Sequence, residues 1–469
     1  MGNSNGHEVD FSQEVNLSQF KLLKVVGRGS FGKVRIVERR DTKKLYALKY
    51  ISKTEIIRLD CVKNICRERV MLENVDHPFV CNLRFAFQDS QYLYMVMDLM
   101  MGGDLRYHLH RSKFNEHVVR FWIAELACAV RYLHSKGIVH RDIKPDNILL
   151  NEAGHVHLTD FNTAAQYNPN RPLTSHSGTA LYMAPEVFKG GGYGPQVDWW
   201  SLGVVFYECI YGRRPFEQHS SEELKQAVMH GDIEYGTRDN SITSVCISAI
   251  QGFLERDPLK RLGAAQLGEE NIAFLKITQH PYFSPIDFAR LEAKELPPLF
   301  RPSAESNYDS MYDLEELLLE ENPLDSRVRY SSSKSKRNPK RTRPIGKKSA
   351  ERVEREYKLM EREFLTFDCS MFERYEGFQD PQRLCVGEPP IWVKPAFEGA
   401  EVASARPSLT IVLEGGGSAA GSSVEDLGET LEGGGGEEDV GLHVQSAPPL
   451  NHLKPPSPNA RYLGKKKHP

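Results

Sequence analysis

Apolar and polar positions alternate along the first part of the chain with the two-residue period of β-strands. Three such runs, at residues 21–26 (KLLKVV), 34–37 (VRIV) and 44–51 (KLYALKYI), combine this alternation with strand-forming side chains. They predict three strands with one face toward a core. A fourth run, residues 92–98 (YLYMVMD), is strongly β-prone and predicts a further strand.

A helix is predicted between the third and fourth strands, because Val62, Ile65 and Leu72 recur at helical spacing. Glu68 falls on the same face, where a carboxylate is costly to bury unless it is paired. Lys49, in the third strand, is the natural partner. Taken alone, Lys49 would be interpreted as an ordinary surface lysine.

From Leu105 onward the spacing is helical, and residues 121–134 (FWIAELACAVRYLH) are apolar on nearly every side. Such a helix is expected at the centre of a larger helical unit. The pattern therefore predicts an α+β chain, with a small β-rich unit carrying one helix at about 20–98 and a larger, mainly helical unit at about 99–283.

Composition adds three segments outside these units. Residues 1–19 are predicted to form a flexible arm, and residues 284–380 a tail that contains a basic run at 334–348 (KSKRNPKRTRPIGKK). From about residue 398 to 469 the chain is rich in Gly, Ser, Glu and Pro, and cannot bury enough apolar surface to offset the entropy of ordering. We therefore expect this last segment to be disordered.

Bulk charge and cysteine usage exclude some classes of protein. The 60 Lys and Arg nearly balance the 63 Asp and Glu, which argues against a whole-protein nucleic-acid binder. None of the eight cysteines forms a C-x-x-C pair, so we expect buried free thiols in a reducing compartment. No apolar run approaches the roughly 20 residues that a membrane-spanning helix needs.

The candidate chemistry is concentrated in residues 138–162 (IVHRDIKPDNILLNEAGHVHLTDFN). Two short apolar runs flank the polar turn at 151–154, which predicts a tight hairpin. Asp142, Asn147 and Asp160 are thereby gathered at its ends. Phosphoryl transfer needs such a set, because one carboxylate takes the hydroxyl proton while an amide and a second carboxylate hold Mg²⁺.

Residues 27–32 (GRGSFG) lie between two predicted strands. A G-x-G-x-x-G pattern also occurs in dinucleotide-binding folds, but there the glycines open a helix. A following strand favours a hairpin that covers phosphates with its backbone N–H groups. Paired with Glu68, Lys49 would reach the α and β phosphates. Residues 92–104 would link the two units and hydrogen-bond an adenine edge, with Met97 at the back of the pocket.

Motif after motif, residues from about 20 to 283 resemble a eukaryotic Ser/Thr protein kinase. The H-R-D-x-x-x-x-N and D-F-x patterns, GTALYMAPE at 178–186 and VDWWSLG at 197–203 carry this resemblance. Asp198-Trp199-Trp200, Lys144 and the tail resemble the AGC group, whose members share a bilobal fold. Asp160-Phe161-Asn162, GGDLRYHL at 102–109 and HVH at 155–157 resemble the YANK (serine/threonine kinase 32) subfamily.

The resemblance implies roles at matching positions. Asp142 would be the catalytic base, Lys144 would steady the γ-phosphoryl group, Lys49 and Glu68 would form the catalytic ion pair, and Asn147 and Asp160 would hold Mg²⁺. The ATP-binding residues would be Val26, Gly27, Arg28, Gly29, Ser30, Phe31, Gly32, Lys33, Val34, Ala47, Lys49, Met97, Asp98, Met100 and Leu149. Leu72, Leu83, His140 and Phe161 would stack as an internal spine, although both leucines are expected core residues in any case.

Two positions depart from the family pattern. Asn162 replaces a glycine, and since asparagine tolerates the left-handed region, the metal-binding turn is expected to remain accessible. Ala165 stands where many AGC kinases carry a basic residue for the activation-loop phosphate. Arg141 remains to pair with a phosphate on Ser175 or Thr174. Activation by phosphorylation of this loop is therefore a hypothesis, in which fewer basic residues would bind the phosphate than in those kinases.

Asp104, Asp146 and Glu208 match positions where AGC kinases that prefer basic substrates bind arginines upstream of the acceptor. The resemblance thus implies such a preference here, with a solvated acidic surface as the alternative. In the tail, residues 363–368 (EFLTFD) resemble the F-x-x-F hydrophobic motif. Phe364 and Phe367 would dock beside the Glu68 helix, with Asp368 in the place of a phosphorylated residue, or would serve packing alone. Glu186 is expected to pair with Arg261.

The expected function is an ATP- and Mg²⁺-dependent Ser/Thr kinase acting on protein substrates. A non-catalytic kinase-like scaffold and a membrane or nucleic-acid adaptor acting through residues 334–348 are the alternatives. Gly2 would permit acylation, although Gly6 replaces the Ser or Thr of the myristoylation motif. We expect a monomer without a specific nucleic-acid partner, in the cytoplasm, with the nucleus or a membrane surface as alternatives.

Overall fold

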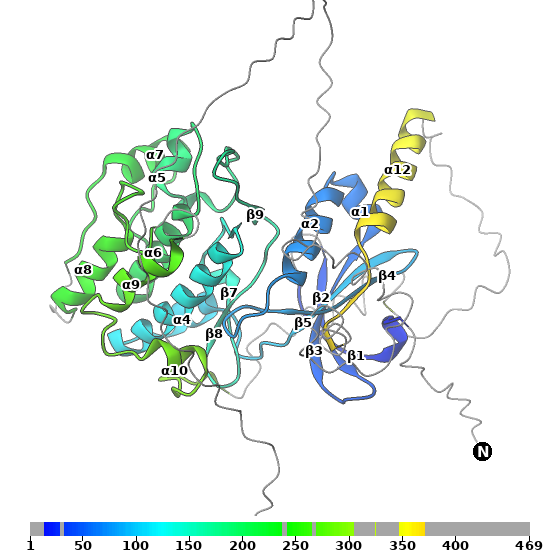
Figure 1. Ribbon diagram of the computed structural model, residues 1–469, viewed down its shortest axis with the longest axis horizontal. Coiled ribbons are helices and arrows are strands. Elements are labelled where there is room, and N and C mark those ends of the chain that lie inside the picture. The colour runs from blue at the N-terminus through cyan, green and yellow to red at the C-terminus, as the bar shows by residue number, and fades with distance from the viewer. Residues whose placement is uncertain are drawn as a thin grey trace, which may run out of the picture. The chain divides into compact units, whose positions relative to one another are not determined.

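The computed structural model describes residues 14–28, 32–236, 242–264, 269–303, 324 and 347–370. Figure 1 shows the strands β1 to β5 grouped with α1, α2 and α12, and the helices α4 to α10 grouped together. The first group comes from the chain's N-terminal part together with its tail, and the second follows β5. The expected division into a β-rich unit and a mainly helical unit is thereby confirmed.

The β-rich unit is an antiparallel sheet with the strand order β1-β2-β3-β5-β4-β10. A 3-10 turn, η1 (Leu17–Gln19), precedes it. Its strands are β1 (Phe20–Arg28), β2 (Lys33–Arg39), β3 (Leu45–Ser52), β4 (Leu83–Gln88), β5 (Tyr92–Asp98) and β10 (Phe367–Asp368). The last of these belongs to the tail, so residues about 280 positions apart in sequence pair at one sheet edge.

The glycine-rich segment joins β1 to β2 as a hairpin. Gly27 pairs with Val34 and Arg28 with Lys33 across the two strands. This register confirms the predicted hairpin and excludes a helix opened by the glycines. Gly29, Ser30 and Phe31 lie outside the described residues.

Two helices follow β3, where the sequence pattern predicted only one. They are α1 (Lys53–Arg58) and α2 (Val62–Glu73). The tail adds α12 (Lys347–Glu363), which contacts both of them (Figure 1, yellow). Gln88 of β4 donates to the backbone carbonyls of Met360 and Phe364 at 3.2 and 2.8 Å and so ties the end of α12 to the sheet.

The helical unit is centred on the apolar helices α4 and α6, which pack against each other. Trp122 of α4 and Trp200 of α6 are among its largest fully buried side chains. Its helices are α3 (Leu105–Arg111), α4 (Glu116–Ser135), α5 (Pro185–Lys189), α6 (Gln196–Tyr211), α7 (Ser221–His230), α8 (Ser244–Phe253), α9 (Glu270–Thr278) and α10 (Phe288–Glu292).

Short strands and turns carry the candidate chemistry at the start of this unit. They are β6 (Ile138–Val139), η2 (Pro145–Asn147), β7 (Ile148–Leu150), β8 (Val156–Leu158), β9 (Ala165–Gln166) and η3 (Ala180–Tyr182). β7 and β8 pair as the predicted hairpin, and β6 pairs with β9.

The described cysteines are free thiols, as expected, and burial raises the pKa of Cys66 and Cys81 to about 12. Within the described ranges, none of the helices combines the length and the apolar character needed to cross a bilayer.

Candidate active site

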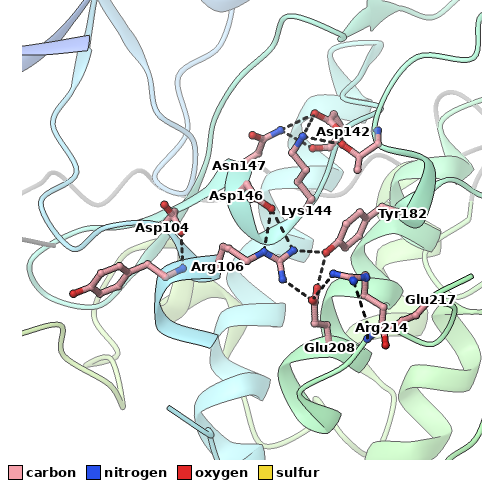
Figure 2. Close-up of polar contacts among 12 residues, drawn as sticks. Asp104, Arg106, Asp142, Lys144, Asp146, Asn147, Tyr182, Glu208, Arg214 and Glu217 are labelled. Carbon is pink, nitrogen blue, oxygen red and sulfur yellow. Dashed lines mark hydrogen bonds and ion pairs between the residues drawn. The ribbon is translucent and has the colours of Figure 1, made fainter. Parts of the chain in front are cut away.

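Asp142 lies at the centre of a hydrogen-bond network that fixes both of its carboxylate oxygens. Lys144 and Asn147 donate to Oδ2 at 2.8 and 3.0 Å. Thr179 donates to Oδ1 through its backbone N–H at 2.9 Å and its hydroxyl at 2.7 Å. Lys144 also donates to the Thr179 hydroxyl at 2.8 Å, so the loop at 140–147 and the segment at 178–186 meet at this carboxylate (Figure 2).

A buried carboxylate, Asp198 of α6, holds the loop that carries Asp142. It accepts the backbone N–H groups of His140 and Arg141 at 2.9 and 2.8 Å and the side chain of His134 at 2.8 Å. Burial is the largest influence and raises the pKa of Asp198, but His134, His140 and the backbone N–H of Arg141 together outweigh it and the pKa is lowered. Arg141 has a φ of 68°, a left-handed conformation that needs such support.

Sequence reasoning quoted Asp198 only as part of a family motif. The signal for its positioning role was present, because an acidic residue in the apolar run VDWWSLG is as costly to bury as Glu68 is on its helix. The contacts of Thr179 with Asp142 had no comparable signal in the sequence.

The predicted Lys49–Glu68 ion pair is confirmed, with Nζ of Lys49 2.7 Å from Oε1 of Glu68. Both side chains are buried. Burial disfavours the charged form of Lys49, but Glu68 and then Asp160 outweigh it and the pKa of Lys49 is raised. The ammonium group is therefore held charged between the sheet and the Asp160 turn.

Asn147 and Asp160 are brought close by main-chain contacts. The backbone N–H of Thr159 donates to the carbonyl of Asn147 at 3.0 Å, immediately before Asp160. The amide nitrogen of Asn147 donates to Asp142, which leaves its amide oxygen as the atom for a cation. An amide oxygen and a carboxylate are the hard donors that Mg²⁺ prefers, so the residues fit such an ion.

Asn162 was expected to be tolerated in this turn because asparagine can adopt left-handed backbone, but it does not adopt that conformation. In this turn the residue with positive φ is Asp160, at 66°, and Asn162 is not in that region. Asn162 instead donates its side-chain amide to Oδ1 of Asp160. Its own Oδ1 is buried and without a hydrogen-bond partner. The substitution thus adds a contact to the predicted metal-binding carboxylate.

The residues predicted to bind adenine come from both units. Ala47 of β3 pairs with Met97 of β5, and Leu149 of β7 forms a bridge with Asp104. The side chain of Asp98 is turned to Arg84, with Nε to Oδ1 at 2.7 Å. Its backbone N–H donates to the carbonyl of Asn82 at 3.1 Å, so neither this N–H nor the carboxylate of Asp98 is free for a ligand.

The remaining predicted nucleotide-binding residues that the structure describes flank this region. Val26, Gly27 and Arg28 end β1, while Gly32, Lys33 and Val34 lead into β2. A side chain at Gly27 would meet no atom within 4 Å, whereas one at Gly32 would meet the carbonyl of Tyr50 at 2.4 Å. Gly27 thus faces open space, and Gly32 is required by close packing. Met100 follows β5 and is partly buried.

All four side chains of the expected spine are buried, and the His140 and Phe161 rings lie 5.0 Å apart, edge to face. The expected Glu186–Arg261 pair is confirmed at 2.6 Å. Nη1 of Arg141 lies 2.6 Å from the hydroxyl of Ser175. This contact places Ser175 where a phosphate would meet Arg141; whether the loop is phosphorylated stays a hypothesis.

The three acidic residues expected to read basic substrates are already engaged. Glu208 and Asp146 contact Arg106 of α3 at 2.5 and 3.2 Å, and Asp104 accepts the backbone N–H of Tyr107 as the N-cap of α3 (Figure 2). No pattern in the sequence indicated that Arg106 would fill this position. The preference for basic residues therefore stays a prediction. The three carboxylates on which it depended already have partners within the chain.

The tail docks on the β-rich unit as expected. Phe364 and Phe367 are buried in the same apolar cluster as Ile65 and Cys66 of α2. Asp368 is buried, with Oδ2 3.7 Å from Nη1 of Arg39, and it accepts the backbone N–H of Ser370. The sequence of residues 314–319 (LEELLL) also predicts a short acidic-apolar helix in the tail, and these residues lie outside the described ranges.

In sequence, residues 20–283 match the family model of the protein kinase domain. This chain belongs to the protein kinase family. It is 38% identical to human serine/threonine-protein kinase 32B over 388 residues, which cover 80% of this chain and 91% of the relative. It is 39% identical to human serine/threonine-protein kinase 32C over 340 residues, covering 70% and 68%.

A plant relative, serine/threonine-protein kinase AtPK2/AtPK19 of Arabidopsis thaliana, is 36% identical over 331 residues that cover 70% of this chain and 68% of the relative. These similarities confirm a Ser/Thr protein kinase that resembles the YANK subfamily. A kinase domain implies ATP, a divalent metal and protein substrates. The alternative of a non-catalytic scaffold finds no support among these relatives.

Proposed function

We propose that this Ser/Thr kinase uses Mg²⁺ with ATP and that Asp142 is the base that accepts the proton of the substrate hydroxyl. The observation that carries the proposal is the network around Asp142, in which Lys144, Asn147 and Thr179 orient its carboxylate. A fixed carboxylate beside an ammonium group suits proton acceptance and charge stabilisation at one place.

The other residues have distinct roles in this proposal. Lys49, held by Glu68 at 2.7 Å, binds the α and β phosphates, and Lys144 steadies the transferred group. Asn147 and Asp160 would hold the metal ion. Bound there, Mg²⁺ would neutralise charge on the phosphate oxygens.

The decisive experiment measures transfer of the ATP γ-phosphate to a Ser/Thr peptide by the wild type and by Asp142→Asn. The asparagine keeps the shape of the side chain but cannot take the proton, so the rate should fall about 10²- to 10⁴-fold. Equal rates would contradict the proposal. Activity that disappears with a chelator and returns with Mg²⁺ but not with Ca²⁺ would support Mg²⁺ as the metal, because Mg²⁺ requires near-ideal octahedral geometry at short distances whereas Ca²⁺ accepts larger, irregular coordination.

Location and assembly remain proposals. We propose a cytoplasmic monomer without a specific nucleic-acid partner, with the nucleus or weak membrane association as the alternatives. Two features would support membrane binding, Gly2 and the basic run at 334–348. Gly2 and residues 334–346 of the run lie outside the described residues.

A further inference from the structure

One guanidinium group of the protein's own chain lies between two acidic side chains beside the catalytic loop. Arg106 of α3 reaches Glu208 of α6 at 2.5 Å and Asp146 of η2 at 3.2 Å. It also donates to the hydroxyl of Tyr182, which in turn donates to Glu208 at 2.6 Å. Figure 2 shows these side chains converging from α3, α6, η2 and η3.

This cluster adjoins the place where an acceptor hydroxyl must approach. Asp146 immediately precedes Asn147, whose amide contacts Asp142 at 3.0 Å. Tyr182 lies three residues after Thr179, which also contacts Asp142. A substrate chain rises only about 3.3 Å per residue when extended, so the neighbours of its acceptor pass within reach of this cluster.

The charges within the cluster are already paired. Arg214 adds a second guanidinium 3.5 Å from Glu208 and also contacts Glu217 at 3.3 Å. Glu208 is buried and Arg106 is mostly covered, with 6% and 18% of their side chains exposed, while Asp146 is 51% exposed. Burial disfavours its charge most strongly, but the contacts with Glu208 and Tyr182 together outweigh burial and raise the pKa of Arg106, so it stays protonated.

We propose that Arg106 is a specificity-determining residue: it occupies the Asp146–Glu208 carboxylate pair, so that an arginine of the substrate gains no ion pair at this subsite. The inference rests on the proposed kinase function. The wild type then accepts substrates with a neutral residue at this subsite as readily as substrates with an arginine. Asp104 is separate, because its carboxylate caps α3 and does not contact Arg106.

The test compares full-length wild type with Arg106→Met on matched peptides. Each pair of peptides differs by one arginine or alanine, placed in turn at each position before the acceptor serine. For the position that faces the cluster, the wild-type ratio of kcat/KM for arginine over alanine should be near one. In Arg106→Met the ratio should rise about tenfold, because an exposed carboxylate forms charge-assisted hydrogen bonds with the arginine of the peptide.

Three further variants make the result decisive. Arg111→Met removes an exposed arginine from the same helix and should leave the ratio as in the wild type. Adding Asp146→Asn and Glu208→Gln together to Arg106→Met should abolish the gain, since both carboxylates are then neutral. Arg106→Gln, which retains a donor toward Glu208, should raise the ratio in the same direction and serves if the methionine variant unfolds on thermal melting.

The outcomes separate the two proposals. If the wild type transfers phosphate to none of the peptides, the proposed function fails. If it transfers phosphate but neither Arg106 variant changes the ratio at any position, the function stands and the role of Arg106 is overturned. A strong wild-type preference for arginine that persists in both variants would overturn it as well.

Discussion

At the scale of single residues, this protein places charges where burial is expensive and holds each one with a specific partner. Lys49 is charged because Glu68 and Asp160 surround it, and Asp198 is ionised because His134 and two backbone N–H groups contact it. Removing either partner would leave an uncompensated charge, which costs more than the pair contributes. The same logic applies to the Asp160 turn.

We predict that Asn162→Gly weakens binding of Mg-ATP about tenfold, because Asp160 loses a hydrogen bond to its charged carboxylate. Glycine also frees the backbone next to Asp160, whose φ of 66° must be held by its surroundings. Calorimetric titration with Mg-ATP measures the effect.

Asn162→Ala serves as the control for backbone freedom. It loses the same hydrogen bond but has less conformational freedom than glycine, so its affinity should lie between those of the wild type and Asn162→Gly. Equal or tighter binding by the glycine variant would show that the amide of Asn162 does not support Asp160.

At the scale of elements, the tail completes the β-rich unit. β10 adds to the open edge of β4, and α12 contacts α1 and α2. Because α2 carries Glu68, a docked tail restrains the helix that positions Lys49. The position of this helix is thereby linked to residues almost 300 positions further along the chain.

We predict that Phe364→Ala releases the tail and lowers kcat. Phe364 is fully buried, and a Phe-to-Ala change in a core costs about 3–5 kcal/mol of packing free energy. We expect this loss to be enough to detach the tail from the sheet. Phosphate-transfer kinetics and hydrogen exchange of the β4 backbone measure the two effects.

Leu365→Ala is the matched control, because the neighbouring Leu365 is 56% exposed and should tolerate the change. If Phe364→Ala exposes β4 to exchange while kcat is unchanged, the tail packs against the sheet without supporting catalysis.

At the scale of the whole molecule, ion pairs join segments that are distant in sequence. Arg261 has no exposed side-chain surface and binds Glu186 with Nη1 to Oε1 at 2.6 Å, so the segment at 178–186 is anchored to the loop after α8. That segment also supplies Thr179 to Asp142. Stability and the geometry of the active site therefore depend on one buried pair.

We predict that Arg261→Ala lowers the free energy of unfolding by about 3–5 kcal/mol, because Glu186 is left without its cation. Urea unfolding measures the loss. Lys260→Ala, at a neighbouring position that is 76% exposed, should change it by less than about 1 kcal/mol. Comparable effects of the two variants would show that the pair is not structurally important.

Much of this architecture could be predicted from sequence. Periodicity and β-propensity identified β1, β2, β3, β5 and the apolar helix α4, but not β4 or β10. The cost of burying a charge identified Lys49 as the partner of Glu68. The predicted hairpin brought Asn147 next to the turn that carries Asp160. These succeeded because each depends on local spacing or on one strong energetic rule.

The sequence by itself determined four strands of the sheet, the helices α2 and α4, and which charges need partners, since these follow from side-chain type and spacing along the chain. Only the tertiary structure decided which partner each charge takes. Asp146 and Glu208 could face a substrate or a residue of the same chain, and folding brings Arg106 of α3 between them. Asn162 likewise contacts Asp160 rather than supplying a left-handed residue. Such choices depend on the three-dimensional approach of side chains from separate elements, which linear spacing does not encode.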